Sequence, residues 1–162
     1  MTGNWKLRVL PHYEQAVHTI QSRGITVNGC FILGLDGDTE ETFDATYEFA
    51  ERVGLFEIQI TVLTPFPGTP LYARLLREGR ILSPGAWERC TLFDVNFVPS
   101  GMSPERLQQG LVDLAKRLYD PDFVQARRDK FFEALYAARQ NVGPGMPEEW
   151  LPRAHNGHAP AA

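Results

Sequence analysis

Cysteine is scarce in this chain of 162 residues, which contains only Cys30 and Cys90. The two residues lie far apart and do not show the paired spacing of metal ligands. Each has apolar neighbours, so we interpret both as buried or half-buried free thiols. A disulfide between them is not expected in a reducing compartment. The sequence therefore predicts no metal ligands and no cysteine-based metal centre within this chain.

Long apolar runs and an excess of positive charge are also missing. No segment approaches the ~18 apolar residues that a membrane-spanning helix needs, and the first eight residues contain no apolar signal-peptide core. The net charge of −4 argues against a nucleic-acid surface, because phosphate binding needs clustered Lys and Arg. We therefore expect a cytoplasmic protein with no membrane span and no nucleic-acid partner.

The first half of the sequence alternates between helical and strand patterns. Apolar residues at helical spacing predict a helix over residues 11–23, and a strand that is almost continuously apolar follows over residues 25–35. A second helix begins at Asp38, which has the capping-box spacing to Glu41, and ends at Gly54. A second strand covers residues 55–63. The crossover is long enough for a parallel pair. Such apolar strands are typical of sheets covered on both faces.

The second half of the sequence is mainly helical. Thr69 or a neighbour begins a third helix, and residues 80–102 show no periodicity. Ser103 has the character of an N-cap before a fourth helix, and a fifth helix runs from about residue 121 to 139. We expect residues 141–162 to be mostly disordered. Two parallel strands cannot form an independent sheet in water, so the working molecule is expected to be larger than this chain.

Asp36 and Asp38 lie between the first strand and the second helix, in the segment whose side chains are best suited to catalysis or ligand binding. A calcium loop does not fit, because Glu41 occupies the position where such a loop needs glycine. An Asp-x-Asp phosphotransferase motif matches out of order, since Gly37 precedes the second aspartate. A turn with a helix cap explains the same residues structurally. The fourth interpretation, a ligand-binding edge, follows from the general placement of ligand sites at strand ends.

Several segments together carry a resemblance to a known family. Residues 31–39 (FILGLDGDT) are similar to the fifth-strand segment of radical S-adenosylmethionine (SAM) barrels, and residues 63–72 (LTPFPGTPLY) resemble the exit of the sixth strand. Residues 78–82 and 90–97 resemble the uncharacterised C-terminal domain of cobalamin-binding radical SAM proteins, a wider group that includes hopanoid methylases. The resemblance covers roughly residues 5–135.

The resemblance implies an α/β fold: a partial radical-SAM-type (β/α) barrel of about two parallel strands with flanking helices, followed by a helical C-terminal extension. It assigns residues 1–82 to the barrel, 83–140 to the extension and 141–162 to a tail. It also implies that Ile32 and Gly34 pack beside the adenine of SAM, and that Leu63, Thr64 and Pro65 offer backbone groups to its edge. For Ile32 and Leu63, ordinary core packing is the structural alternative.

The departures from the family pattern concern its cofactors. Complete members hold a 4Fe–4S cluster through Cys-x3-Cys-x2-Cys and bind SAM and, in this group, cobalamin. Nothing in this sequence has the cysteine spacing, so none of the three is expected to bind stably to this chain alone, and no catalytic residue is assigned to it. A separate N-terminal half that carries the cysteines is the partner that the resemblance implies. The small-molecule substrate is not indicated.

Three hypotheses for function follow. In the first, the chain supplies part of the SAM-binding wall and a substrate-side cap to a radical SAM enzyme. In the second, it is a non-enzymatic assembly module or a gene remnant, whose exposed strand edges favour association. In the third, it is a small phosphatase that uses Asp36 and Asp38. Arg80, Arg89 and Asp94 are further candidates, either for a substrate face or for surface ion pairs.

Overall fold

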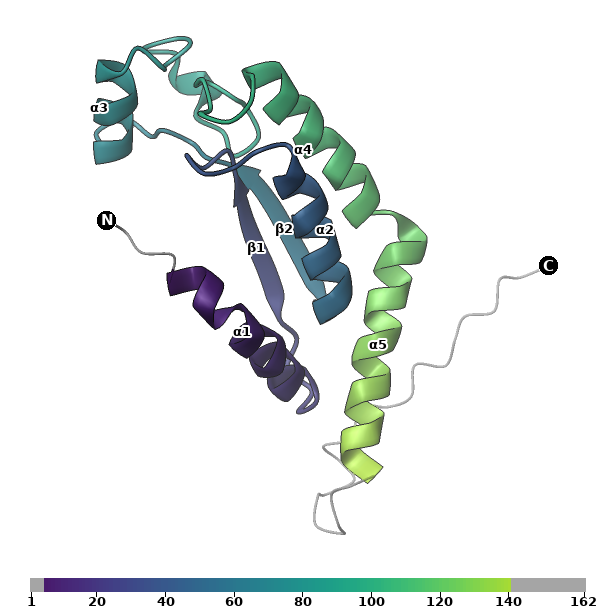
Figure 1. Cartoon of the computed structure of the whole chain (residues 1–162). Coiled ribbons are helices and arrows are strands. Elements are labelled where there is room, and N and C mark those ends of the chain that lie inside the picture. The colour runs from purple at the N-terminus through teal and green to yellow at the C-terminus, as the bar shows by residue number, and fades with distance from the viewer. Residues whose placement is uncertain (1–4, 141–162) are drawn as a thin grey trace, which may run out of the picture.

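A two-stranded parallel sheet lies at the centre of the chain (Figure 1). The computed structural model describes the backbone of residues 5–140 and the side chains of residues 12–138. The elements follow in the order α1 (Trp5–Gln21), β1 (Asn28–Leu33), α2 (Glu41–Val53), β2 (Glu57–Val62), α3 (Pro70–Arg77), the 3-10 helix η1 (Trp87–Arg89), α4 (Pro104–Leu118) and α5 (Pro121–Gln140). The predicted parallel strand–helix–strand unit is thereby confirmed. The tail predicted to be disordered lies outside the described residues.

Local capping chemistry sets several helix ends as the sequence predicts. The hydroxyl oxygens of Thr69 and Ser103 accept hydrogen bonds from the third amide of α3 and of α4, each at 3.2 Å. A proline follows each cap at the first helical position, where no amide donor is needed. Gly54 ends α2 in the left-handed conformation, with a φ of 65°. Helix α1 differs, since it already begins at Trp5.

The predicted capping box at Asp38 is wrong. Glu40, not Asp38, precedes α2, and it makes no side-chain cap. The Asp38 carboxylate instead accepts hydrogen bonds from the amides of Gly34 at 2.8 Å and Leu35 at 3.0 Å. The turn after β1 brings these two amides within reach of Asp38, and an unpaired amide is costly to leave unsatisfied. Asp38 therefore closes the turn behind it and does not cap the helix ahead of it.

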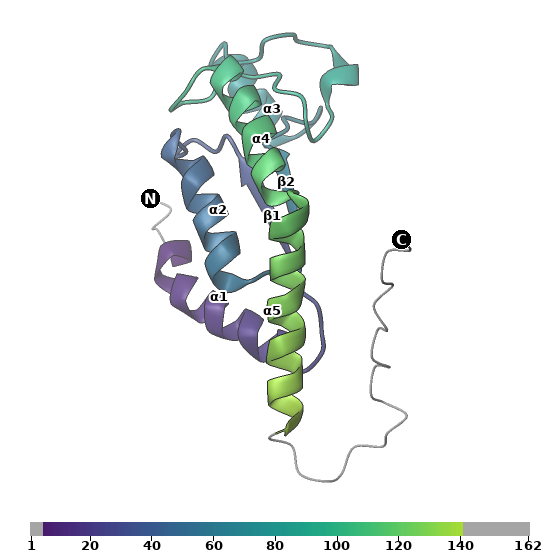
Figure 2. The same cartoon turned by 90° about the vertical axis from the view of Figure 1, so that its right-hand side faces the viewer.

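Helices cover only one face of the sheet. Leu33, Ile58, Ile60 and Val62 share that face and are buried, with α1, α2 and α4 on the same side in both views (Figures 1 and 2). On the opposite face Cys30 is exposed and Ile32 keeps 53% of its surface accessible. The prediction that both faces are covered is therefore wrong for the described residues. The prediction of buried thiols is also wrong for Cys30, while Cys90 is half-buried.

The core joins the strands to the C-terminal helices. Leucines of α4 lie at helical spacing and are almost completely buried against the sheet and α2: Leu107, Leu111, Leu114 and Leu118. Gly110 lets the two helices approach, because a Cβ there would come within 2.2–2.6 Å of the Phe43 ring. The division of the chain at residue 82 stays a prediction, and residues from both sides of it contribute to this core.

Arg127 connects α5 to the rest of the molecule through hydrogen bonds to backbone carbonyls. Its guanidinium donates to the carbonyl oxygens of Leu55 at 2.9 Å, Phe56 at 3.3 Å and Leu118 at 3.2 Å. The side chain is buried, and its Nε has no hydrogen-bond partner within the described part of the chain. Burial lowers the pKa of this guanidinium. Among the described residues no carboxylate forms an ion pair with this cation, which serves as a donor for backbone carbonyls at the end of α4 and just after α2.

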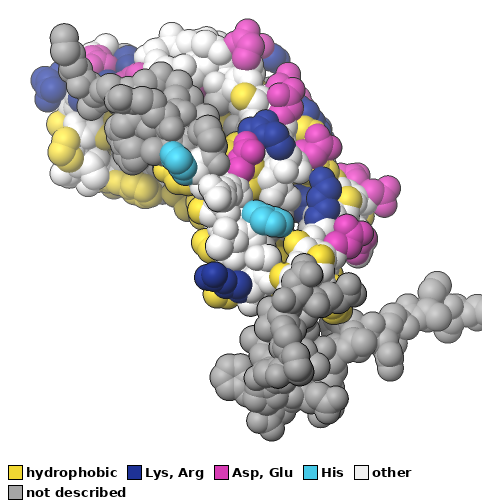
Figure 3. Space-filling model, turned by 60° about the horizontal axis from the view of Figure 1, so that its bottom comes forward, with side chains coloured by type: hydrophobic (Ala, Val, Ile, Leu, Met, Phe, Trp, Pro, Cys, Tyr) yellow, Lys and Arg dark blue, Asp and Glu magenta, His cyan; other side chains and the backbone are white. Residues whose placement is uncertain are grey.

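The surface is uneven in character. Viewed from below, most of the visible acidic and basic side chains lie on the right, with apolar side chains between them, and further apolar side chains line the lower left edge (Figure 3). Exposed apolar residues recur on the loops: Leu35 and Phe66 follow the two strands, Leu82 follows α3 and Phe93 follows η1. Within residues 5–140, no helix has the length and apolar character to cross a membrane.

Candidate functional site

The carboxyl ends of β1 and β2 meet at one edge of the sheet. The register pairs Leu33 with Val62, and the amide of Leu63 donates to the carbonyl of Leu33 at 2.8 Å. Parallel strands place the segments that follow them side by side, which is where α/β proteins bind ligands. This edge therefore brings together the five residues singled out in the sequence: Ile32, Gly34, Leu63, Thr64 and Pro65.

Ile32 lies on the open face, one residue before the end of β1. Its neighbour across the ladder is Thr61, whose hydroxyl donates to the carbonyl of Phe31 at 3.4 Å. With 53% of its surface accessible, Ile32 is not part of the core. Core packing, the structural alternative for this residue, does not describe its position. An exposed isoleucine beside a small polar residue offers a flat apolar contact to a ligand.

Gly34 makes the turn that leaves the sheet, and it does so with a φ of +88°. A Cβ at this position would lie 2.7 Å from Cδ2 of Leu107 and 3.1 Å from Cζ of Phe97. Both the backbone conformation and the contact with α4 therefore require glycine. This is a packing reason for Gly34 that applies whether or not a ligand lies beside it.

The segment after β2 is held from two sides. The Thr64 hydroxyl lies 2.8 Å from the carbonyl of Thr91 and 3.2 Å from that of Val62, and Thr64 and Pro65 are buried. Leu63 is half-buried and packs against the core, in agreement with the alternative interpretation of this residue as ordinary core packing. Residues 63–65 are thus fixed by β1 and by the segment around Thr91, so their backbone has a defined position at the sheet edge.

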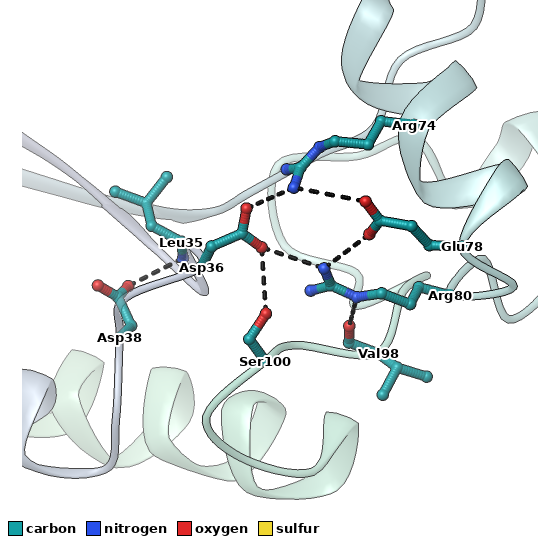
Figure 4. A network of polar contacts seen from close by, with 8 residues as sticks. All are labelled: Leu35, Asp36, Asp38, Arg74, Glu78, Arg80, Val98 and Ser100. Carbon is teal, nitrogen blue, oxygen red and sulfur yellow. Dashed lines mark hydrogen bonds and ion pairs between the residues drawn. The ribbon is translucent and has the colours of Figure 1, made fainter. Parts of the chain in front are cut away.

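An ion-pair network joins this edge to the following segments (Figure 4). Asp36 accepts hydrogen bonds from Arg74 at 2.5 Å, from Arg80 at 3.1 Å and from Ser100 at 3.2 Å. The Glu78 carboxylate also accepts a hydrogen bond from the Arg80 guanidinium, at 3.0 Å. The Arg74 guanidinium, with Arg80 and Ser100, lowers the pKa of Asp36 against the opposing effect of burial. The network ties the turn after β1 to α3 and to the loop before α4.

Arg80 is the most enclosed member of this network. Its side chain is 19% exposed, its Nε donates to the carbonyl of Val98 at 2.7 Å, and its second terminal nitrogen has no partner within the described residues. The two candidates beside it in the sequence lie elsewhere: Asp94 accepts from the Thr91 hydroxyl at 2.6 Å, and Arg89 belongs to η1. Sequence reasoning missed Arg74 and Ser100, which carry no local signal of their partnership with Asp36.

The geometry disfavours a phosphatase built on Asp36 and Asp38. Asp36 is engaged by two guanidinium groups, and Asp38 by two backbone amides. Burial raises the pKa of Asp38, while the amides of Leu35 and Gly34 act in the opposite direction. Neither carboxylate is left free to attack a phosphoryl group. In addition, no group of three or more His, Cys, Asp or Glu side chains is arranged as metal ligands within the described residues.

Comparison with known proteins points consistently to one group of enzymes. The chain is 29% identical over 118 residues to the bacteriochlorophyllide d C-12(1)-methyltransferase of Chlorobaculum tepidum, covering 73% of the chain and 25% of that enzyme. It is 33% identical over 134 residues to the hopanoid C-2 methylase of Rhodopseudomonas palustris, covering 83% and 24%. It is also 28% identical over 97 residues to the anaerobic magnesium-protoporphyrin IX monomethyl ester cyclase of Cereibacter sphaeroides, covering 60% and 14%.

Residues 69–153 match the model of a family described as a domain of unknown function (DUF4070). The match spans more than half of the chain, and the chain belongs to this family. The resemblance inferred from the sequence, to the C-terminal part of radical SAM proteins with this uncharacterised domain, is thereby confirmed. The chain spans about a quarter of the length of the two methyltransferases.

Proposed function

We propose that this chain forms the C-terminal part of a radical SAM methyltransferase, which is the most specific role that its relatives and its open sheet face jointly support.

 It supplies one segment of the SAM-binding wall and a cap on the substrate side, and it does not complete catalysis alone. Two of its relatives act, by their names, on bacteriochlorophyllide d and on hopanoids. For this chain we propose methyl transfer to a small-molecule acceptor, with the acceptor left open.

The observation that carries the proposal is the exposed position of Ile32 at the carboxyl end of β1. An apolar side chain with 53% of its surface accessible, on a sheet face that no described helix covers, is suited to a planar ligand. Adenine is such a ligand. The backbone of Leu63, Thr64 and Pro65 is held at the same edge of the sheet. This position supports a role for its backbone groups in hydrogen bonding to the edge of the adenine ring. In this proposal Gly34 shapes the turn between them.

The residues present do not fit an iron–sulfur cluster. Such a cluster needs three or four thiolates, whereas the chain has two cysteines, one exposed on the open face and one half-buried after η1. We therefore assign the 4Fe–4S cluster of the complete protein to a segment outside these 162 residues that carries Cys-x3-Cys-x2-Cys. Cobalamin is assigned outside these residues as well. In this chain, SAM contact is the property to test.

A chimaera tests the SAM-binding role. The region of the Rhodopseudomonas palustris methylase that matches this chain is replaced by the chain itself, and binding of labelled SAM is measured by equilibrium dialysis. Ile32→Glu is expected to weaken SAM binding at least tenfold, because it places a charge against the adenine face. Ile25→Glu is the matched control, since Ile25 is similarly exposed (59%) but precedes β1 at the opposite end of the sheet.

Equal SAM affinity in the two variants would overturn the assignment of Ile32. Circular dichroism of both variants excludes general unfolding as the cause of a loss. A chimaera that folds but binds no SAM with Ile32 intact would count against the proposed function as a whole.

A further inference from the structure

A row of aromatic rings runs along α5 from the core to the surface. The ring centroids of Phe56 and Phe131 lie 4.8 Å apart, and those of Phe131 and Phe132 lie 5.3 Å apart. The row continues to Tyr136, whose ring centroid is 6.4 Å from that of Phe132. Phe131 is buried, whereas Phe132 and Tyr136 are 36% and 46% exposed. Because Phe132 and Tyr136 are four residues apart, they share one side of the helix, and this pair is the aromatic face of α5.

The aromatic face belongs to the part of α5 that leaves the rest of the molecule. The last turns of this helix project beyond α1 and the sheet in both views (Figures 1 and 2). Arg128, one turn before Phe132, is also exposed. No ion pair joins it to another described residue. The exposed side of α5 is therefore apolar, with a positive charge at the end nearer the sheet.

The small size of this face favours a segment of the same chain as its occupant. A stable interface between separate molecules buries about 1,200 Å² or more, which is more than two partly exposed side chains provide. A segment that is covalently attached close by has a high effective concentration, so a few contacts suffice to hold it. The segment that follows α5 begins where the aromatic face ends.

Residues 141–153 have the composition that this face requires. The match to the family model extends 13 residues beyond the end of α5, to residue 153, so this segment belongs to the same domain. Trp150 and Leu151 lie next to each other within it, directly after Glu148 and Glu149. Such an apolar pair is unfavourable in water, and an indole ring packs well against other aromatic rings. The two carboxylates complement the charge of Arg128, although an exposed pair of this kind contributes little.

The length of the segment allows Trp150 to reach the face. Nine residues separate Trp150 from the end of α5, and an extended chain of that length spans about 30 Å. Tyr136 and Phe132 lie only about 6 and 12 Å before the end of the helix, at a rise of about 1.5 Å per residue. Residues 143–145 (Gly-Pro-Gly) suit a reversal of direction, because proline followed by glycine fits the two central positions of a type II turn.

We infer that residues 146–151 fold back along α5 and place Trp150 on the aromatic face, with the acidic pair that precedes it near Arg128. The segment covers the exposed rings of Phe132 and Tyr136 and completes the C-terminal end of the domain. The sequence-based expectation of disorder is thereby restricted to residues 154–162. This inference concerns the fold of the chain itself and does not depend on SAM binding.

Fluorescence quenching tests the inference on the full chain. Trp5→Phe and Trp87→Phe leave Trp150 as the only tryptophan. Acrylamide is expected to quench Trp150 about threefold less in this chain than in a synthetic peptide of residues 141–162, because a stacked indole is shielded from solvent. Tyr136→Glu is expected to raise quenching to the level of the peptide, since it places a charge against the indole. Val112→Glu is the matched control, because Val112 is similarly exposed (41%) but lies on α4, and it should leave quenching unchanged.

A nuclear Overhauser contact between the rings of Trp150 and Tyr136 tests the same packing in the unmodified chain and needs no substitution. Peptide-like quenching of Trp150 in the full chain, or the absence of this contact, would overturn the inference. Shielding that persists in Tyr136→Glu and in Phe132→Glu, with both variants folded by circular dichroism, would also overturn it. Shielding that appears only in a dimer detected by light scattering would assign the face to a second copy and refute the fold-back.

Discussion

Replacing Gly34 with alanine tests whether packing, independently of any ligand, requires glycine at the turn after β1. The left-handed backbone conformation at φ +88° costs a non-glycine residue about 1–2 kcal/mol. The added Cβ would lie 2.7 Å from Leu107, which is fully buried and cannot move aside without disturbing α4, and overpacking of this kind costs about 1–3 kcal/mol. Together these effects predict a loss of about 2–5 kcal/mol in the free energy of unfolding.

Urea denaturation of the full chain, followed by circular dichroism, measures this loss in the absence of SAM. At a slope of ~1–3 kcal/mol per molar urea, the midpoint should fall by about 1 M or more. Gly37→Ala is the matched control, because no atom lies within 4 Å of a Cβ there and its φ is not in the left-handed region; its effect should stay within about 0.5 kcal/mol. A Gly34→Ala variant as stable as the Gly37→Ala variant would refute the reasoning.

Two further predictions concern charged side chains. Arg127→Met should lower the free energy of unfolding by about 2–4 kcal/mol, because it leaves the carbonyls of Leu55 and Leu118 without their donor; Arg128→Met, at an exposed neighbour, is the control, and equal urea midpoints would contradict the account. Asp36→Asn should cost at most about 1 kcal/mol at neutral pH, since the ion pairs are partly exposed. Because Arg74 lowers the pKa of Asp36, the ionised carboxylate stabilises the fold above that pKa and this contribution is lost as the pH falls through it. The difference between Asp36→Asn and the unmodified chain should therefore vanish in acid, and a difference that persists there would contradict the ion-pair explanation.

The features that the sequence predicts well depend on neighbouring residues. Thr69, Ser103 and Gly54 set helix ends through bonds or backbone conformations within one turn. Such local chemistry is visible in a sequence because the partners are a few positions apart. The parallel pairing of the two strands also follows from the length of their connection and is confirmed.

The features that the sequence does not predict depend on distant residues or on what covers a surface. Asp36 is paired with Arg74 and Arg80, which are 38 and 44 positions away. The Asp38 carboxylate could accept hydrogen bonds from amides on either side of it in the sequence. The conformation of the folded turn brings the amides of Gly34 and Leu35 into reach, and the sequence does not show this. Ile32 belongs to an apolar run that suggests burial on both faces, yet it is exposed, because the described chain provides helices for one face only.

Anaerobic reconstitution with iron and sulfide tests the central proposal most directly, namely that the cysteines of the 4Fe–4S cluster lie outside these 162 residues. The chain alone should acquire no 4Fe–4S absorption, because it has only two cysteines. The complex with the preceding segment of the Rhodopseudomonas palustris methylase should hold one cluster per pair and bind SAM. A stable 4Fe–4S cluster on the isolated chain would contradict the account.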